Sequence, residues 1–188
     1  IPQQEIKKVT LASAMVTRIM WFERQFDFNY PVGIFPSILG RVRGTPARLE
    51  EMVHSFPASI LTIRINASWS IQEHVGHLFD LEELHFVRLE DYEANASTLR
   101  PADLKNRKTV DANHNASPIG QLLSMFRSNR LECVQRLESM DDAQVARSAI
   151  HPRLKKPMRM IDMAFFVAEH DDHHMASMTE IAQRLKRQ

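Results

Sequence analysis

Two histidines near the carboxyl end of the chain are the residues best suited to chemistry. His170 and His174 lie four residues apart in a segment whose apolar positions follow a helical spacing. Side chains four apart on a helix share one face, so both rings can present a nitrogen to one ion at about 2.0 to 2.1 Å. A firmly held divalent ion needs at least a third protein ligand. The spacing therefore predicts part of a metal site, and another element must complete it.

A second histidine-rich segment can provide the third ligand. His74 and His77 both lie in it, three residues apart. His77 is favoured because it shares a face with Asp80 and adjoins the apolar stripe that includes Leu78. Spacing alone leaves His74 as an alternative.

Other polar residues are candidates for catalytic or binding roles. The carboxylates could accept an imidazole N–H or act as a general base; they are Glu73, Asp80, Glu82 and Glu169. His114, in a long polar loop, could be a fourth ligand or face a substrate above the metal. Arg107 and Lys108 in the same loop could bind a substrate carboxylate. An aromatic just before a helix usually packs in the core, and we interpret Trp69 in that way.

The elements that carry these residues are predicted to be helices. The chain has only five glycines, and it lacks the alternating β-branched runs that indicate strands. Residues 34–56 form one kinked helix or two short ones, with Thr45 as an N-cap before Pro46. A capping box at Ser70 and Glu73 begins a long helix that continues towards Tyr92.

Two further long helices complete the set. One follows Ser117 and Pro118 and runs to about Met140, and the last runs from about Arg159 to Lys186. Residues 101–116 are expected to be a long polar loop, residues 141–142 to start a short turn, and residues 151–157 to be a basic loop. Four helices joined in this way predict an all-α four-helix bundle over residues 31–188, preceded by an arm or short helix at 1–30. We give residues 1–20 no functional role.

Composition excludes several classes of function. Lys plus Arg number 24 against 23 Asp plus Glu, which gives no basic excess for binding nucleic acid or an anionic membrane. No apolar run approaches the roughly 20 residues of a bilayer span. The single cysteine, Cys133, excludes an internal disulfide framework and fits a cytoplasmic protein.

Several motifs together resemble the DinB-like metalloprotein superfamily. The resemblance extends from about Trp21 onward and includes residues 44–50. Its core is the pattern Trp69-Ser70-x-Gln72-Glu73-x-x-Gly76-His77-Leu78-x-Asp80-x-Glu82, followed far downstream by His170-Asp171-x-x-His174. Many relatives carry Gln three residues beyond the last histidine, where this chain has Ser177.

The resemblance implies an up-down-down-up bundle that binds a divalent metal between its helices. It implies His77, His170 and His174 as the ligands and so selects His77 over His74. Three neutral histidines suit Zn or Ni, with Fe, Mn and Cu as alternatives, and they leave open positions where water or a thiol can be activated. The resemblance also implies a homodimer.

Two classes of function are therefore expected. The first is a metal-dependent enzyme acting on a small molecule, either a hydrolase or a thiol-dependent S-transferase or isomerase that uses a low-molecular-weight thiol. Its catalytic candidates are His114, Glu73 and Glu169. The alternative is a non-catalytic, stress-associated binding or dimerisation module whose metal is structural.

Overall fold

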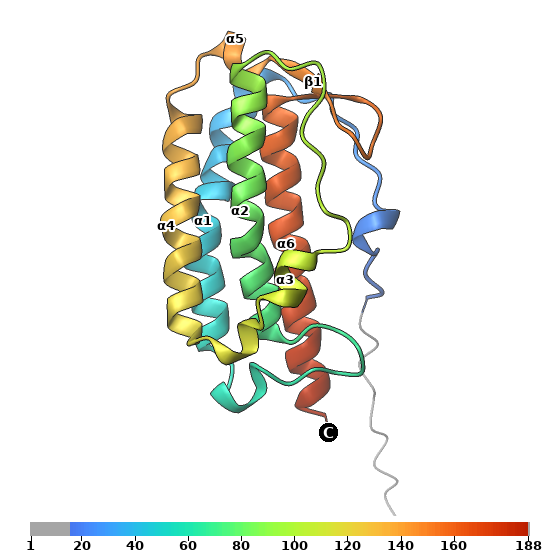
Figure 1. Ribbon diagram of the computed structural model, residues 1–188, viewed down its shortest axis with the longest axis vertical. Coiled ribbons are helices and arrows are strands. Elements are labelled where there is room, and N and C mark those ends of the chain that lie inside the picture. The colour runs from blue at the N-terminus through green and yellow to red at the C-terminus, as the bar shows by residue number, and fades with distance from the viewer. Residues whose placement is uncertain (1–15, 188) are drawn as a thin grey trace, which may run out of the picture.

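Four long helices form a bundle in the computed structural model, which describes residues 16–187 (Figure 1). They are α1 (Phe35–His54), α2 (Ile71–Glu93), α4 (Ile119–Glu138) and α6 (Met160–Leu185). α1 and α6 run in one direction, and α2 and α4 run in the other. Each of α1 and α2 packs against both α4 and α6. The predicted up-down-down-up bundle is confirmed.

The start of α2 follows directly from its sequence. The Ser70 hydroxyl accepts from the backbone N–H of Glu73 at 3.1 Å, and the Glu73 carboxylate accepts from the backbone N–H of Ser70 at 2.9 Å. This capping box satisfies two N–H groups that would otherwise lack a partner at the helix end. It fixes the helix that carries His77.

The first helix differs from the expectation at Thr45. α1 is continuous, with Pro46 inside it, so Thr45 is not an N-cap. Proline has no N–H to donate to the carbonyl four residues earlier, which is that of Val42. Arg130 of α4 donates its Nη1 to that carbonyl at 3.5 Å instead. The fully buried Thr45 donates its hydroxyl to Asp171 of α6 at 3.0 Å.

The connections contain more regular structure than expected. The crossover from α2 to α4 travels back along the bundle and holds α3 (Arg107–Asp111) and a 3-10 turn, η4 (His114–Ala116). Asn106 and Asn113, just before these elements, adopt positive φ angles of 51° and 48°, which asparagine tolerates better than most residues. The predicted turn after Asp141 is α5 (Asp142–Val145).

A two-stranded antiparallel hairpin was not expected. Its strands are β1 (Ser148–Ile150) and β2 (Pro157–Arg159), and together they flank the predicted basic loop. Three-residue strands are too short to show an alternating pattern. The crossover pairs with this hairpin, because the N–H of Leu99 donates to the carbonyl of Ile150 at 3.0 Å.

The chain before α1 lies against the bundle. Arg18 forms an ion pair with Glu180 of α6 at 3.1 Å, and the Trp21 ring packs on Phe166 with centroids 4.8 Å apart. This segment includes the 3-10 turns η1 (Trp21–Glu23) and η2 (Val32–Ile34), and a third, η3 (Ala58–Ile60), follows α1. Residues 1–15 of the predicted arm lie outside the described part of the chain. Among the described helices, none is both long and apolar enough to cross a membrane.

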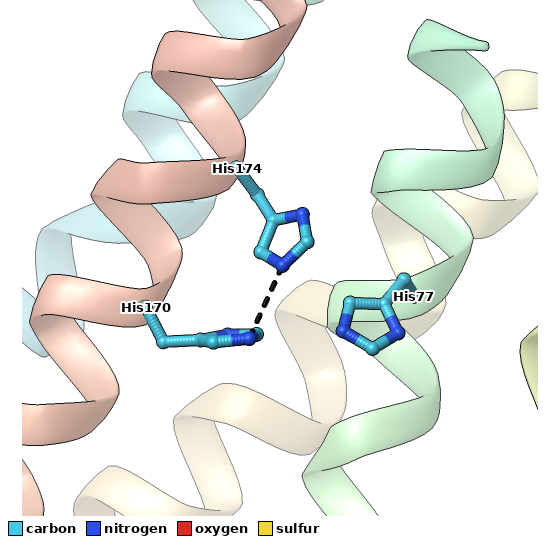
Figure 2. A group of neighbouring side chains, drawn as sticks. All are labelled: His77, His170 and His174. Carbon is cyan, nitrogen blue, oxygen red and sulfur yellow. Dashed lines mark hydrogen bonds between the residues drawn. The ribbon is translucent and has the colours of Figure 1, made fainter. Parts of the chain in front are cut away.

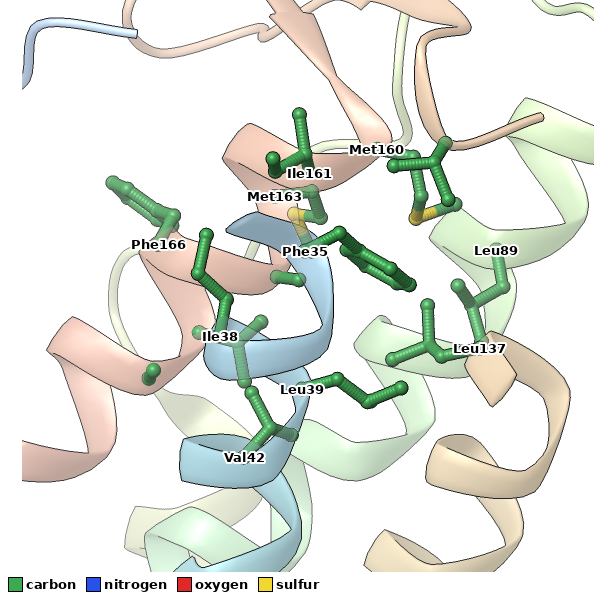
Figure 3. Close-up of a cluster of buried hydrophobic side chains, with 14 of the residues drawn as sticks. Phe35, Ile38, Leu39, Val42, Leu89, Leu137, Met160, Ile161, Met163 and Phe166 are labelled. Carbon is green, nitrogen blue, oxygen red and sulfur yellow. The ribbon is translucent and has the colours of Figure 1, made fainter. Parts of the chain in front are cut away.

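A buried polar layer divides the apolar core into two clusters. Figure 3 shows the cluster that lies at the hairpin end of the bundle, built around Phe35, Ile38, Leu89 and Met160. The second cluster lies toward the other end and includes Leu49, Ile71, Leu78, Phe126 and Met178. Between them in sequence, on each long helix in turn, lie the buried residues Thr45, Glu82, Arg130 and Asp171.

Arg130 is the centre of this polar layer. Its side chain is fully buried, and its guanidinium forms ion pairs with Glu82 of α2, at 2.7 Å, and with Asp171 of α6. The carboxylates raise the pKa of Arg130 well above its ordinary value, despite the opposing effect of burial. Through the Val42 carbonyl it also contacts α1. One side chain therefore connects all four helices.

We predict that Arg130→Met destabilises the fold by about 3 to 5 kcal/mol, because it leaves two buried carboxylates without their cation. The measurement is the free energy of unfolding in urea. Arg136→Gln is the matched control, since Arg136 pairs with Glu93 at the surface and should change stability by about 1 kcal/mol or less. Equal effects of the two substitutions would contradict the role given to Arg130.

Candidate metal centre

Three histidines from two facing helices converge beside the bundle's polar layer. His77 comes from α2, and His170 and His174 come from α6 (Figure 2). One ring nitrogen from each lies within 4.8 Å of those of the other two. The Nε2 atoms of His170 and His174 are 3.1 Å apart. The structure thus brings together the three residues chosen as metal ligands.

The protein holds these rings in their neutral form. Burial, together with the nearby His74, His85 and His114, lowers the pKa of His77 to about 3. Burial likewise places the pKa values of His170 and His174 well below their ordinary range. A neutral imidazole offers a lone pair, which is the form that binds a metal.

A buried chain of hydrogen bonds orients His77. The Thr109 hydroxyl donates to the Asp80 carboxylate at 2.8 Å, and His77 Nδ1 lies 3.1 Å from the same hydroxyl oxygen. A hydroxyl has one proton, so when it donates to Asp80 it must accept from His77 Nδ1–H. This network assigns the proton to Nδ1 and leaves the His77 Nε2 lone pair free. Such support is typical of metal-binding histidines.

His74 has a comparable role toward His174. Their Nδ1 atoms lie 2.8 Å apart. If His174 uses Nε2 as its ligand atom, its Nδ1–H donates to the bare Nδ1 of His74. His74 is therefore placed behind the three-histidine cluster, as an acceptor for one of its members.

The geometry and the donor set fit a divalent ion. Two imidazole nitrogens that bind one tetrahedral ion at about 2.0 to 2.1 Å are about 3.3 to 3.4 Å apart, close to the 3.1 Å between His170 and His174. The facing Nε2 atoms of His170 and His174 can share only one proton between them, whereas an ion placed between them would accept the lone pairs of both. An all-nitrogen set of this kind suits Zn, Ni, Cu or Fe(II).

The structure does not bring His114, the candidate fourth ligand or substrate contact, into the three-histidine cluster or the lining of the cavity described below. His114 Nε2 lies 2.8 Å from Asp80 Oδ2, and its buried ring packs over Gly76. A Cβ on Gly76 would lie 2.2 Å from that ring. His114 therefore secures the same Asp80 oxygen that accepts from Thr109.

Glu73 and Glu169 are both held in ion pairs. Glu73 caps α2 and accepts from Arg64 Nε at 2.8 Å, and this bond lowers the pKa of Glu73 to about 2. Glu169 pairs with Arg24 and with Arg41, the latter at 2.6 Å. Neither carboxylate is directed at the three histidines, so the structure does not support either as a general base.

Of the remaining candidates, two carboxylates support buried side chains and two basic residues lie at the surface. Asp80 supports His77 as described, and Glu82 pairs with Arg130. Arg107 and Lys108 are exposed and pair with Asp103 and Glu83, at 2.9 and 2.6 Å. They do not line the cavity described below. Ser177 donates its hydroxyl to the His173 carbonyl at 2.9 Å and is not among the residues that line the cavity.

Trp69 is not a core residue. Its ring lies 4.7 Å from that of His77 and 6.2 Å from that of His174, measured between centroids. It is half-buried and forms a wall of the cluster. On the other side, Trp21 covers His170 with centroids 4.8 Å apart. The predicted arm at residues 1–30 thus contributes to the site through Trp21.

All three histidines line a cavity of about 500 Å³. Its walls come from α2, α6, the crossover, the loop between the β-strands and the N-terminal arm. Most of the side chains that line the cavity are apolar. They include Leu81, Leu84, Leu104, Met163 and Phe166. The centre is therefore accessible to a small molecule.

Sequence reasoning missed Thr109, Trp69 and the arm for different reasons. Thr109 is one of many threonines, and only the fold of the crossover brings it to His77. Trp69 belonged to the family-like motif but was interpreted as core. Nothing in the sequence near Met20 and Trp21 indicates that they line the cavity.

The chain resembles known proteins in sequence and in fold. Residues 41–178 match the model of the DinB superfamily. A Bacillus subtilis (strain 168) protein named "Putative metal-dependent hydrolase YfiT" is 25% identical over 142 residues, which is 74% of this chain and 79% of that protein. The solved structure of YfiT, described as "a probable metal-dependent hydrolase with an unusual four-helix bundle topology", superposes with a TM-score of 0.75 at 18% identity. The superposition covers 87% of this chain and 94% of the YfiT chain.

We predict that Thr109→Val weakens metal binding about 10- to 100-fold, because His77 loses the partner that fixes its proton on Nδ1. Titration with Zn or Ni in competition with a chelator measures this. Thr179→Val removes a hydroxyl that bonds only within α6, to the Met175 carbonyl. That control should bind metal as the parent does, and an unchanged affinity in Thr109→Val would argue against the hydrogen-bond chain.

Gly76→Ala should destabilise the protein by about 1 to 3 kcal/mol, because the new methyl group has to displace the His114 ring. Gly44→Ala, also inside a long helix, meets nothing within 4 Å and should stabilise α1 by about 0.5 to 1 kcal/mol. Thermal unfolding of both variants tests the packing of the crossover on α2. A neutral Gly76→Ala would show that His114 is not held there.

Proposed function

This chain belongs to the DinB superfamily, and we propose that it is a divalent-metal-dependent hydrolase acting on a small molecule. The observation that carries the proposal is the accessible cluster of His77, His170 and His174 at the wall of a cavity of about 500 Å³. The relative YfiT, named for metal-dependent hydrolysis, supports the same reaction class.

The three histidines would hold the ion through neutral ring nitrogens. When bound by these histidines, a divalent ion would keep open coordination positions and would supply the Lewis-acid chemistry that hydrolysis of a small molecule needs. We favour Zn or Ni because the donor set is entirely imidazole, with Fe, Mn and Cu as alternatives.

The surrounding side chains orient the ligands and shape the cavity. Thr109 and Asp80 hold the proton of His77 on Nδ1, and His74 can accept the Nδ1–H of His174. Trp69 packs on His77, Trp21 packs on His170, and both tryptophans line the cavity. Ligands fixed in this way reorganise little when a metal or substrate binds.

A purely structural metal is less well supported. A structural site normally has four protein ligands. Among residues 16–187 the cluster holds three histidines, and His114, the expected fourth, is bonded to Asp80. The cavity beside the cluster would also have no purpose in a structural site. Thiol transfer would use the same open positions, but no contact in the cavity favours a thiol over water.

The test uses protein prepared without a histidine tag. Elemental analysis should find one divalent ion per chain, and His77→Ala, His170→Ala and His174→Ala should each lose it. Hydrolysis of 4-nitrophenyl butyrate should stop on chelation and return when Zn or Ni is added. His54→Ala, an exposed histidine at the end of α1, is the matched control and should retain both metal and activity.

Retention of a stoichiometric ion by the three variants would contradict the ligand assignment. If the protein holds stoichiometric metal but hydrolyses no ester or amide in a panel of small substrates, the reaction class is contradicted. That result would favour a structural metal.

A further inference from the structure

Three buried hydrogen-bond donors without acceptors lie in the same cavity as the histidines. They are Arg88 Nη2, His151 Nε2 and Arg153 Nη2, and none has a partner among residues 16–187. All three residues line the cavity. Native proteins satisfy almost all buried polar groups, so three unsatisfied donors at one site require an explanation.

Arg88 is a buried cation without an ion pair in the described part of the chain. Its side chain is on α2, the residue is 3% exposed, and its Nε donates to the Arg100 carbonyl at 3.0 Å. Burial lowers the pKa of Arg88 to about 10, so it is still charged at neutral pH. The next two acids on the helix, Glu90 and Asp91, both pair with Arg100 instead, each at 2.8 Å.

The hydrogen bond at Nδ1 of His151 determines which ring nitrogen carries the proton. This residue is 2% exposed, and its Nδ1 accepts from the backbone N–H of Leu154 at 3.1 Å. A neutral ring that accepts at Nδ1 carries its proton on Nε2. The unsatisfied Nε2 is therefore an N–H group.

Arg153 is held between two aromatic rings. Its Cζ lies 5.3 Å from the centroid of Phe22 and 5.8 Å from that of Phe166. The His151 ring also packs on Phe166, with centroids 5.4 Å apart, so both donors border the same aromatic side chain. Stacking positions a guanidinium without neutralising its charge.

Few negative charges oppose this cluster. Asp103 is the one acid among the residues that line the cavity. Its carboxylate accepts from Arg107 Nε at 2.9 Å and from two backbone N–H groups, those of Lys105 and Arg107. Lys155 adds another positive charge to the lining. An oxyanion would supply acceptors to all three donors and charge to both arginines.

Arg88 of the donor cluster and His77 of the histidine cluster occupy different positions along α2. Arg88 is eleven residues beyond His77, which is about 16 Å along a helix axis at 1.5 Å per residue. Leu81 and Leu84 lie on the cavity wall between them. A ligand that reaches both sites needs an apolar middle part.

Building on the metal-dependent hydrolase proposed above, we propose that the substrate carries an oxyanion, a carboxylate or a phosphate, which Arg88, His151 and Arg153 bind. Its apolar part would lie along Leu81, Leu84 and Phe166, and its hydrolysable group would lie at the three histidines. The cluster thus determines specificity for anionic, elongated small molecules.

The test compares three probes of equal chain length in binding titrations with the purified protein: hexanoate, hexyl phosphate and the neutral hexanamide. At least one of the two anions should bind ten times or more tightly than hexanamide. The stronger of the two identifies the group as a carboxylate or a phosphate. Equal binding of all three probes would overturn the proposal.

Variants locate the anion. Arg153→Gln and Arg88→Gln should reduce the preference for the anion over hexanamide to about twofold or less, whereas Arg136→Gln, an arginine of α4 outside the cavity, should keep it. Arg153 is half-buried, and within residues 16–187 its side chain makes no hydrogen bond to the backbone, so its variant remains informative if Arg88→Gln fails to fold. A preference retained in Arg153→Gln would contradict the assignment.

His77→Ala separates this proposal from the metal site. If the arginine cluster binds the anion, the preference persists in His77→Ala whether or not the protein holds a metal. A preference that disappears in His77→Ala and survives in Arg153→Gln would place the anion at the histidines and overturn the proposal. Failure of the hydrolase proposal would instead appear as an absence of metal or of hydrolysis, with anion binding intact.

Discussion

A buried guanidinium in an apolar bundle has to be surrounded by carboxylates, and that constraint fixes how the helices meet. Arg130 of α4 reaches Glu82 on α2, Asp171 on α6 and the Val42 carbonyl on α1. Sliding α2, α4 or α6 by one turn would leave a buried charge unpaired, at a cost of several kcal/mol. Asp171 directly follows His170, and Glu82 lies on the helix of His77. The ion pairs that align the bundle therefore also align the histidines.

The crossover between α2 and α4 converts this alignment into a specific site. It has to travel back along the bundle because α2 and α4 run in the same direction. On the way it places Thr109 between Asp80 and His77, and His114 fits against Asp80 only because residue 76 is glycine. The long connection that the topology requires thus also supplies the contacts that orient one ligand.

The sequence predicted local features of the structure better than contacts between distant residues. The capping box at Ser70 and the four-residue spacing of His170 and His174 are encoded within one turn, so the sequence indicated both. Thr45 was misplaced because a threonine before proline usually caps a helix, whereas here Arg130, 85 residues later, satisfies the carbonyl that Pro46 leaves free. The contacts of Trp69, Thr109 and Trp21 depend on tertiary packing, which has no local signal. The homodimer stays a prediction.

The central claim is that one divalent ion is bound by three histidine nitrogens from α2 and α6. Crystals grown with Zn and measured at its absorption edge test it most directly. We predict one strong anomalous peak about 2.0 to 2.1 Å from His77 Nε2, His170 Nε2 and His174 Nε2. A peak at another site, or full occupancy with His114 as a ligand, would contradict the account.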